Sequence, residues 1–97
     1  MKVAEIILSQ LGGRRFLMMT GSYNLCEMAD GKGLVMKLRR NTSGANWLQI
    51  RLNGADLYDL RFIKAGKTLN TKAEYNDIYC DQLEDIFTRV TGLYTRL

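Results

Sequence analysis

Residues 46–65 read NWLQIRLNGADLYDLRFIKA, and this stretch decides how the rest of the chain is arranged. In its first arm Leu48, Ile50 and Leu52 occupy every second position, which is the period of a β-strand with one buried face. The second arm repeats this alternation around Leu60. Between the arms, Asn53-Gly54 tolerates the positive φ angles of a tight reversal. The stretch therefore predicts a β-hairpin.

Shorter alternating runs on both sides of the hairpin predict more strands. The predicted strands cover Arg15–Thr20, Tyr23–Met28 and Leu34–Arg39, and Thr68–Tyr75 fits a further edge strand with Leu69, Thr71, Ala73 and Tyr75 on one face. Asp30-Gly31-Lys32-Gly33 predicts a second hairpin turn, and residues 40–45 (RNTSGA) predict a polar loop.

Helical spacing occurs only near the two ends of the chain. Val3–Leu11 places apolar residues on one helix face and is followed by Gly12-Gly13, which favours a helix end. A second helix is predicted over about Cys80–Thr91, with Gly92 just after it. Its start has two candidate caps, Asp81 (with Glu84 three residues on) and Asp77.

These elements predict one α+β domain covering residues 1–97. One antiparallel sheet of four to five strands, with an N-terminal and a C-terminal helix packed on one face, buries every apolar stripe at once. The opposite sheet face is then left largely exposed. A chain of 97 residues is of ordinary size for a single domain.

Composition excludes several kinds of site. The chain has no histidine, so a histidine-dependent triad, a histidine general base and a histidine metal site are all excluded. Its two cysteines, Cys26 and Cys80, lack metal-ligand spacing and are expected as free thiols in a reducing compartment. With neither a secretion signal nor a membrane-spanning run, we expect a cytoplasmic protein. No catalytic residue, metal site or cofactor is predicted.

Basic residues are expected on the exposed sheet face. The strand phases place Lys37, Arg39, Arg51 and Arg61 there, around Trp47. Such side chains are suited to hold a phosphate backbone while a base stacks on the indole. The net charge of +4 has the sign that a polyanion partner requires. A solvated face that only keeps the protein soluble explains the same pattern.

Three other motifs have structural explanations that suffice. Gly12-Gly13-Arg14-Arg15 lacks the spacing of a phosphate-binding loop and is expected to join a helix to a strand. The acidic residues after Tyr75 do not follow a calcium-binding pattern and suit a helix start. The methionines, Met18, Met19, Met28 and Met36, are expected to fill the core.

Two segments resemble a known group of proteins. Leu11–Gly21 (LGGRRFLMMTG) is similar to an LGG-x-x-F-x-x-MTG pattern, and Ile86–Thr95 (IFTRVTGLYT) is similar to IF-T-x-x-TGL-x-T. Both resemble small uncharacterised proteins of bacteriophages and mobile genetic elements. The middle of the chain, Asn46–Leu52 followed by Leu57-Tyr58, is also similar, so the likeness covers most of the chain. The resemblance implies a phage or integrated-element origin and a bacterial cytoplasm. It carries no activity and no functional residues over to this sequence.

The sequence thus favours a small non-enzymatic accessory protein that acts by binding. One hypothesis is single-stranded nucleic acid held on the basic sheet face. A second is a protein that inhibits or modulates a host system, docking through the same face or a sheet edge. A third is self-assembly, with a homodimer as the expected product.

Overall fold

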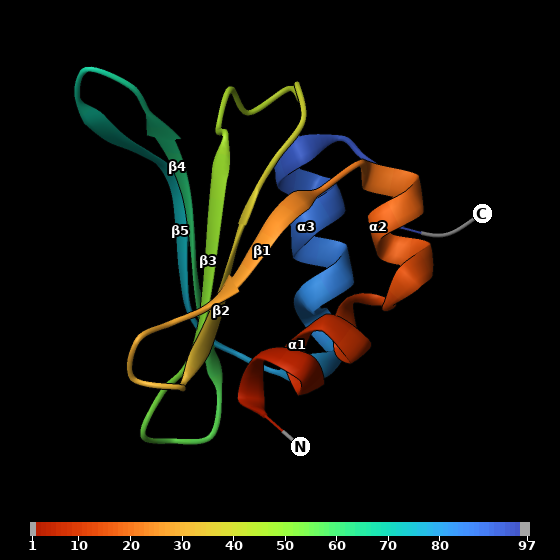
Figure 1. Cartoon of the computed structure of the whole chain (residues 1–97), viewed down its shortest axis with the longest axis vertical. Coiled ribbons are helices and arrows are strands. Elements are labelled where there is room, and N and C mark those ends of the chain that lie inside the picture. Colours follow the sequence, from red (N-terminus) through yellow and green to blue (C-terminus); the bar gives the residue numbers. More distant parts are fainter. Residues whose placement is uncertain (1, 96–97) are drawn as a thin grey trace.

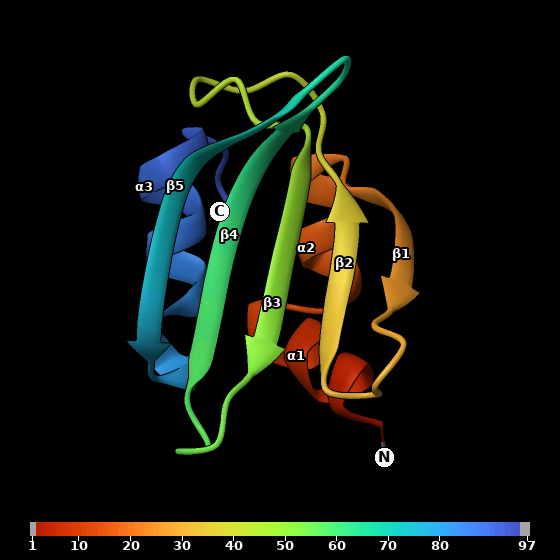
Figure 2. The ribbon, with the colours of Figure 1, turned by 90° about the vertical axis from the view of Figure 1, so that its left-hand side faces the viewer.

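The computed structural model describes residues 2–95, which form a five-stranded antiparallel sheet covered on one face by helices (Figure 1). The elements follow one another as α1 (Val3–Leu11), α2 (Arg14–Thr20), β1 (Tyr23–Glu27), β2 (Gly33–Lys37), β3 (Trp47–Leu52), β4 (Tyr58–Ala65), β5 (Leu69–Ile78), the 3-10 turn η1 (Cys80–Gln82) and α3 (Leu83–Thr91). Figure 2 shows the strands side by side in chain order, with the helices behind them. The predicted fold class is confirmed. None of the helices within residues 2–95 has the length and apolar character that crossing a membrane requires.

The central hairpin forms as predicted from residues 46–65. Strands β3 and β4 pair from Trp47↔Ile63 to Leu52↔Tyr58. The turn is longer than a two-residue reversal, and its positive φ angle falls at Asp56 (61°) rather than at Gly54. The Asn53 side-chain carbonyl accepts hydrogen bonds from the backbone N–H groups of Ala55 (2.8 Å) and Leu57 (3.2 Å). An Asx-type side-chain contact therefore shapes this turn.

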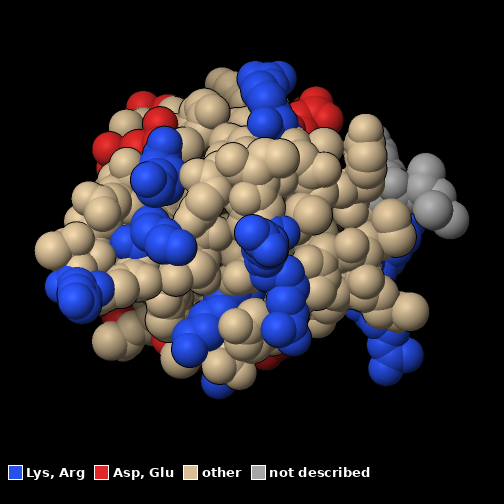
Figure 3. All heavy atoms as spheres, turned by 90° about the horizontal axis from the view of Figure 1, so that it is seen from above, with Lys and Arg blue, Asp and Glu red and all other residues tan. Residues whose placement is uncertain are grey.

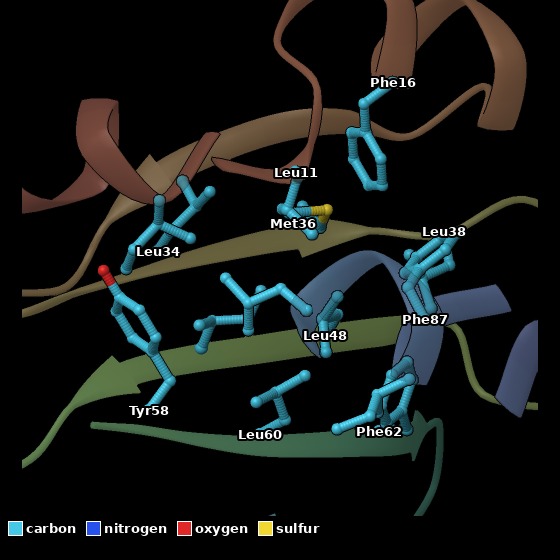
Figure 4. Close-up of a cluster of buried hydrophobic side chains, with 14 of the residues drawn as sticks. Leu11, Phe16, Leu34, Met36, Leu38, Leu48, Tyr58, Leu60, Phe62 and Phe87 are labelled. Atoms are coloured by element: carbon cyan, nitrogen blue, oxygen red, sulfur yellow. The ribbon is translucent and has the colours of Figure 1, made fainter. Parts of the chain in front are cut away.

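The core lies between the inner sheet face and the helices. Its fully buried side chains come from every layer: Ile7 and Leu11 of α1, Phe16 of α2, Met36, Leu48, Ile50, Leu60 and Phe62 of the sheet, and Leu83 and Phe87 of α3. The Phe16 and Phe87 rings meet edge to face with centroids 4.9 Å apart, and Phe62 lies 6.4 Å from Phe87 (Figure 4). These aromatic contacts join α2, α3 and β4 into one core.

The predicted strand at Arg15–Thr20 is wrong, because this segment is the helix α2. The two residues that α2 buries, Phe16 and Thr20, are four apart and so share one helix face. The Thr20 hydroxyl donates to the Phe16 carbonyl at 2.8 Å. Met18 turns to the opposite side and is 77% exposed, so its predicted place in the core is wrong, whereas Met36 is buried as expected.

Strand β5 confirms the further edge strand, but its predicted phase is wrong. Thr71 pairs with Ile63, whereas Ala73 pairs with Phe62. One extra residue, Lys72, therefore lies in a β-bulge and switches the face that the following residues present. Leu69 and Thr71 share the outer side with Ile63, and Ala73 and Tyr75 share the inner side with the core.

The C-terminal helix is confirmed, but neither predicted aspartate cap begins it. The chain enters through the short turn η1, where the Gln82 side-chain oxygen accepts a hydrogen bond from the Tyr79 backbone N–H at 3.2 Å. Gly92 ends α3 in the left-handed conformation, as expected from the sequence.

Candidate nucleic-acid interface

The outer sheet face carries the predicted site residues in three cross-strand rows. The register aligns Lys37, Trp47 and Ile63 in the first row, Val35, Gln49 and Arg61 in the second, and Arg51 and Asp59 in the third. Arg39 lies two residues beyond Lys37, just past the end of β2. The structure therefore brings Lys37, Arg39 and Trp47 to one half of the face and Arg51 and Arg61 to the other.

Trp47 lies half-buried on this face, between a cation and an apolar surface. The Lys37 ammonium is 5.5 Å from the centre of the indole ring, within the range of a cation–π contact. Ile63, the cross-strand partner of Trp47, is only 7% exposed although it faces outward. A shallow groove of about 280 Å³ adjoins the indole, and Leu69, 75% exposed, lies on its rim. A flat aromatic surface beside an amine suits a nucleobase next to a phosphate.

Arg39 is held in a fixed position by two contacts. Its guanidinium carbon lies 4.1 Å from the centre of the Tyr23 ring, and its Nε donates to the Gly21 carbonyl at 3.2 Å. Tyr23 pairs with Lys37, so Arg39 adjoins the first row. Neither Arg39 nor Lys37 forms an ion pair within residues 2–95.

Arg51 and Arg61 have acidic partners. Arg51 forms an ion pair with Asp30, and Arg61 Nε lies 3.5 Å from a carboxylate oxygen of Glu74. The pKa of Asp30 is lowered, chiefly because the Lys32 backbone N–H donates to its carboxylate at 3.0 Å and further because Arg51 lies beside it. This half of the face is hollowed into a groove of about 530 Å³ in which the opposite charges are close to balanced.

Asp59 does not pair with an arginine within the described residues. Its carboxylate accepts hydrogen bonds from the Asn53 side chain (3.1 Å) and from the Asp77 backbone N–H (3.0 Å). Asp77 itself has a positive φ angle of 57° at the second bulge of β5. The role of Asp59 is therefore to hold the β3–β4 turn against the end of β5.

A group of basic residues that the sequence pattern did not predict lies at the end of the sheet beyond Trp47. Figure 3 looks onto this end and shows blue Lys and Arg side chains over its middle, with red acidic side chains toward the margins. The group comprises Arg40 in the loop after β2, Lys64 at the end of β4, Lys67 in the β4–β5 turn and Lys72 in the bulge. Lys64 lies at this end because it follows Ile63, the cross-strand partner of Trp47.

The cysteines and acidic residues form no second site in the described chain. Cys26 and Cys80 are exposed, free thiols. Within residues 2–95, no three acidic or cysteine side chains gather closely enough to hold a metal ion.

Comparison of the sequence with models of protein families, with curated proteins and with solved structures finds no match.

Proposed function

We propose that this protein binds single-stranded nucleic acid through the half of the outer sheet face that carries Lys37, Arg39 and Trp47. In this proposal it is a non-enzymatic accessory protein of a phage or mobile element, acting in the cytoplasm of a bacterial host. The resemblance of Leu11–Gly21 and Ile86–Thr95 to phage proteins supports the origin. The arrangement of charge on the sheet supports the ligand.

One observation carries the proposal: Lys37, beside the only tryptophan of the chain, and Arg39, over the neighbouring Tyr23, have no acidic partner among residues 2–95. The arginines farther along the face, Arg51 and Arg61, are paired. A cation already neutralised by a carboxylate offers little to a phosphate. Lys37 and Arg39 retain their full charge for an anion. The indole beside Lys37 supplies a stacking surface that accepts any base, which favours single strands without strong sequence preference.

Fluorescence anisotropy of a labelled oligothymidylate of about 12 nucleotides tests the proposal, since small single-strand-binding folds cover ~4–16 nucleotides. We expect binding that weakens as salt is raised. Trp47→Leu keeps an apolar side chain against Ile63 but removes the stacking surface. It should cost about 1–3 kcal/mol of binding free energy, a loss of roughly five- to 150-fold.

Two substitutions of equal charge separate the halves of the face. Lys37→Ala and Arg61→Ala each remove one positive charge, and we expect a clearly larger loss of affinity from Lys37→Ala. Wild-type protein that leaves the anisotropy of the oligonucleotide unchanged at low salt would falsify the proposal. Equal losses from the two variants would assign binding to overall charge and not to this half.

A protein partner is the second candidate, and the groove beside Arg51 and Arg61 favours it. The groove alternates charge across neighbouring strands and is lined by Met28, Ala29, Asp30, Val35, Gln49, Arg51, Asp59, Arg61, Glu74 and Asn76. Charges of both signs in a hollow suit a peptide segment that carries complementary charges. An inhibitor or modulator of a host system would use this half of the face.

A pull-down from bacterial lysate distinguishes the two candidates. Material retained by wild-type protein but released by nuclease supports nucleic acid. Proteins that remain after nuclease, and are lost with Arg61→Ala but not with Trp47→Leu, support the second candidate. No retained protein after nuclease treatment counts against it.

A further inference from the structure

The basic end of the sheet contains a polar groove of about 310 Å³, and none of the first-row residues lines it. Its walls are formed by residues that leave β2, enter β3 and end β4: Leu38, Arg39, Arg40, Asn41, Gly44, Ala45, Asn46 and Lys64. Three of these are cationic and none is acidic. Within the described chain, Arg39, Arg40 and Lys64 form no ion pair.

The loop that forms one wall is fixed by its own side chains. Asn41 donates from Nδ2 to the carbonyls of Arg39 (2.7 Å) and Ala45 (2.8 Å), and its Oδ1 accepts from the Ser43 backbone N–H (3.1 Å). The Thr42 N–H donates to the Thr91 carbonyl at 3.1 Å, which attaches the loop to the end of α3. The groove is therefore held in shape before any ligand binds, and the loop loses little conformational freedom on binding.

The opposite wall is joined to the same scaffold through Asn46. Its Nδ2 donates to the Ala65 carbonyl at 2.9 Å, and its Oδ1 accepts from the Ala65 N–H at 2.7 Å. This pair of hydrogen bonds from the start of β3 to the end of β4 places Lys64 beside the loop. Lys72 approaches from the bulge, since a Cβ at Gly44 would lie 3.9 Å from its Cε.

Two features connect this groove with the indole. Asn46 and Lys64 directly adjoin Trp47 and Ile63 in the chain, and alternation along the strands places the two sets on opposite sides of the sheet end. Arg39 belongs to both places, because it lines the groove and also lies over Tyr23 next to the first row. A single-stranded nucleic acid that passes over the end of the sheet would therefore contact both sites in turn.

We infer that this groove binds the phosphates of the single strand whose base stacks on Trp47. This inference rests on the proposed function and adds a separate backbone-binding site to it. Arg40 and Lys64 contact phosphate oxygens, Arg39 lies between the groove and the first row, and Asn41 and Asn46 position the backbone around them. The groove has no aromatic wall, so it recognises the sugar–phosphate chain and not the bases.

An abasic oligonucleotide separates the two sites, because it keeps the phosphates and has no bases to stack. The variant to test is Arg40→Gln with Lys64→Gln. Both wild-type side chains are exposed. Its control is Arg14→Gln with Lys32→Gln, which removes the same charge from exposed positions in α2 and in the β1–β2 turn. Circular dichroism of each variant checks that the fold is retained.

We expect the groove variant to bind both the abasic and the thymidylate oligonucleotides several-fold more weakly than the control variant. Two lost phosphate contacts should also reduce the slope of log K against log salt by about 1.4 for a single strand. Trp47→Leu should weaken binding of the thymidylate oligonucleotide alone.

Groove and control variants that bind equally would overturn the phosphate site while leaving the proposed function in place, provided that Trp47→Leu still weakens thymidylate binding. A wild-type protein that binds neither oligonucleotide would overturn the proposed function and this inference with it.

Discussion

Asn46 shows how a single side chain arranges both candidate sites. It lies between the polar groove and Trp47, and its amide satisfies both backbone groups of Ala65. Its own backbone accepts from Leu38 and donates to Ile63, each at 2.9 Å. Asn46 therefore connects the ends of β2, β3 and β4 through hydrogen bonds. These bonds also fix the positions of the neighbouring Trp47 and Lys64.

Asn46→Ala should lower the free energy of unfolding by about 1–3 kcal/mol, because two partly buried backbone groups of Ala65 lose their partners. Urea denaturation followed by circular dichroism measures the change. Asn70→Ala is the matched control, since Asn70 is exposed in β5 and, among residues 2–95, its side chain makes a single hydrogen bond, with Thr68 at 3.5 Å. Equal stability of the two variants would contradict the role assigned to Asn46.

At the scale of elements, α2 positions Arg39 as well as closing the core. Gly21 ends the helix with a φ angle of 70°, which a residue with a Cβ adopts only at a cost. Its carbonyl accepts the hydrogen bond from Arg39. A Cβ at this position would lie 2.8 Å from Cγ of the same arginine. The end of α2 and the Arg39 side chain are therefore coupled through one glycine.

Gly21→Ala should destabilise the protein by about 1 kcal/mol or more and displace the Arg39 side chain. We therefore expect both a lower unfolding midpoint in urea and weaker oligonucleotide binding. Gly54→Ala provides the comparison, because a Cβ added at Gly54 would have no atom within 4 Å and the residue has no positive φ angle. The coupling assigned to Gly21 is wrong if the two alanine variants behave alike.

The elements also show why part of the fold was predictable from sequence. The hairpin and the inner sheet face follow from alternation over long strands, where the period is unambiguous. The run FLMM in α2 is too short for its period to separate helix from strand, and only the contacts of Phe16 and Thr20 decide it. Nothing in the residue types around Lys72 indicates the bulge, so the predicted phase of β5 was wrong.

The candidate site was predictable to a similar extent. Strand phase correctly placed Lys37, Trp47, Arg51 and Arg61 on the outer face. It contained no information on which arginines have acidic partners, because the partner of Arg51 lies in a distant turn and the partner of Arg61 depends on the register of a bulged strand. Predicting the basic group at the sheet end would have required the relative positions of the four segments that carry Arg40, Lys64, Lys67 and Lys72.

At the scale of the whole molecule, the contact between α1 and the sheet makes stability depend on pH. The Tyr58 hydroxyl donates to Gln10 at 2.7 Å, and the ring is only 6% exposed. Burial raises the pKa of Tyr58 above its ordinary value of 10.0, and the neighbouring Cys80 raises it further. The folded state therefore holds the tyrosine proton more tightly than the unfolded chain does. This contribution is present below pH 10.0 and is lost as the pH rises through the raised pKa.

Tyr58→Phe removes the titrating group, so its stability should fall less steeply than that of the wild type as the pH rises above about 10. At neutral pH the same variant should lose about 0.5–1.5 kcal/mol, the worth of one hydrogen bond. Urea titrations at several pH values measure both effects. Parallel pH profiles for the two proteins would contradict the assignment.

Both edges of the sheet carry irregularities that disfavour pairing with a second copy. Strand β5 has bulges, one of them at Lys72, and the register of β1 shifts between Tyr23 and Cys26. We therefore expect a monomer at micromolar concentration in light scattering. A mass that doubles with concentration would favour the self-assembling alternative.

In the proposed function nucleic acid contacts the molecule at Trp47, and the emission of this single tryptophan reports on that contact directly. Titration of the unlabelled oligothymidylate at low salt should quench the emission, with the same midpoint as the anisotropy experiment, and added salt should reverse the quenching. The abasic oligonucleotide should bind without comparable quenching. Binding of the thymidylate oligonucleotide that leaves the tryptophan emission unchanged would show that the bases do not stack on Trp47.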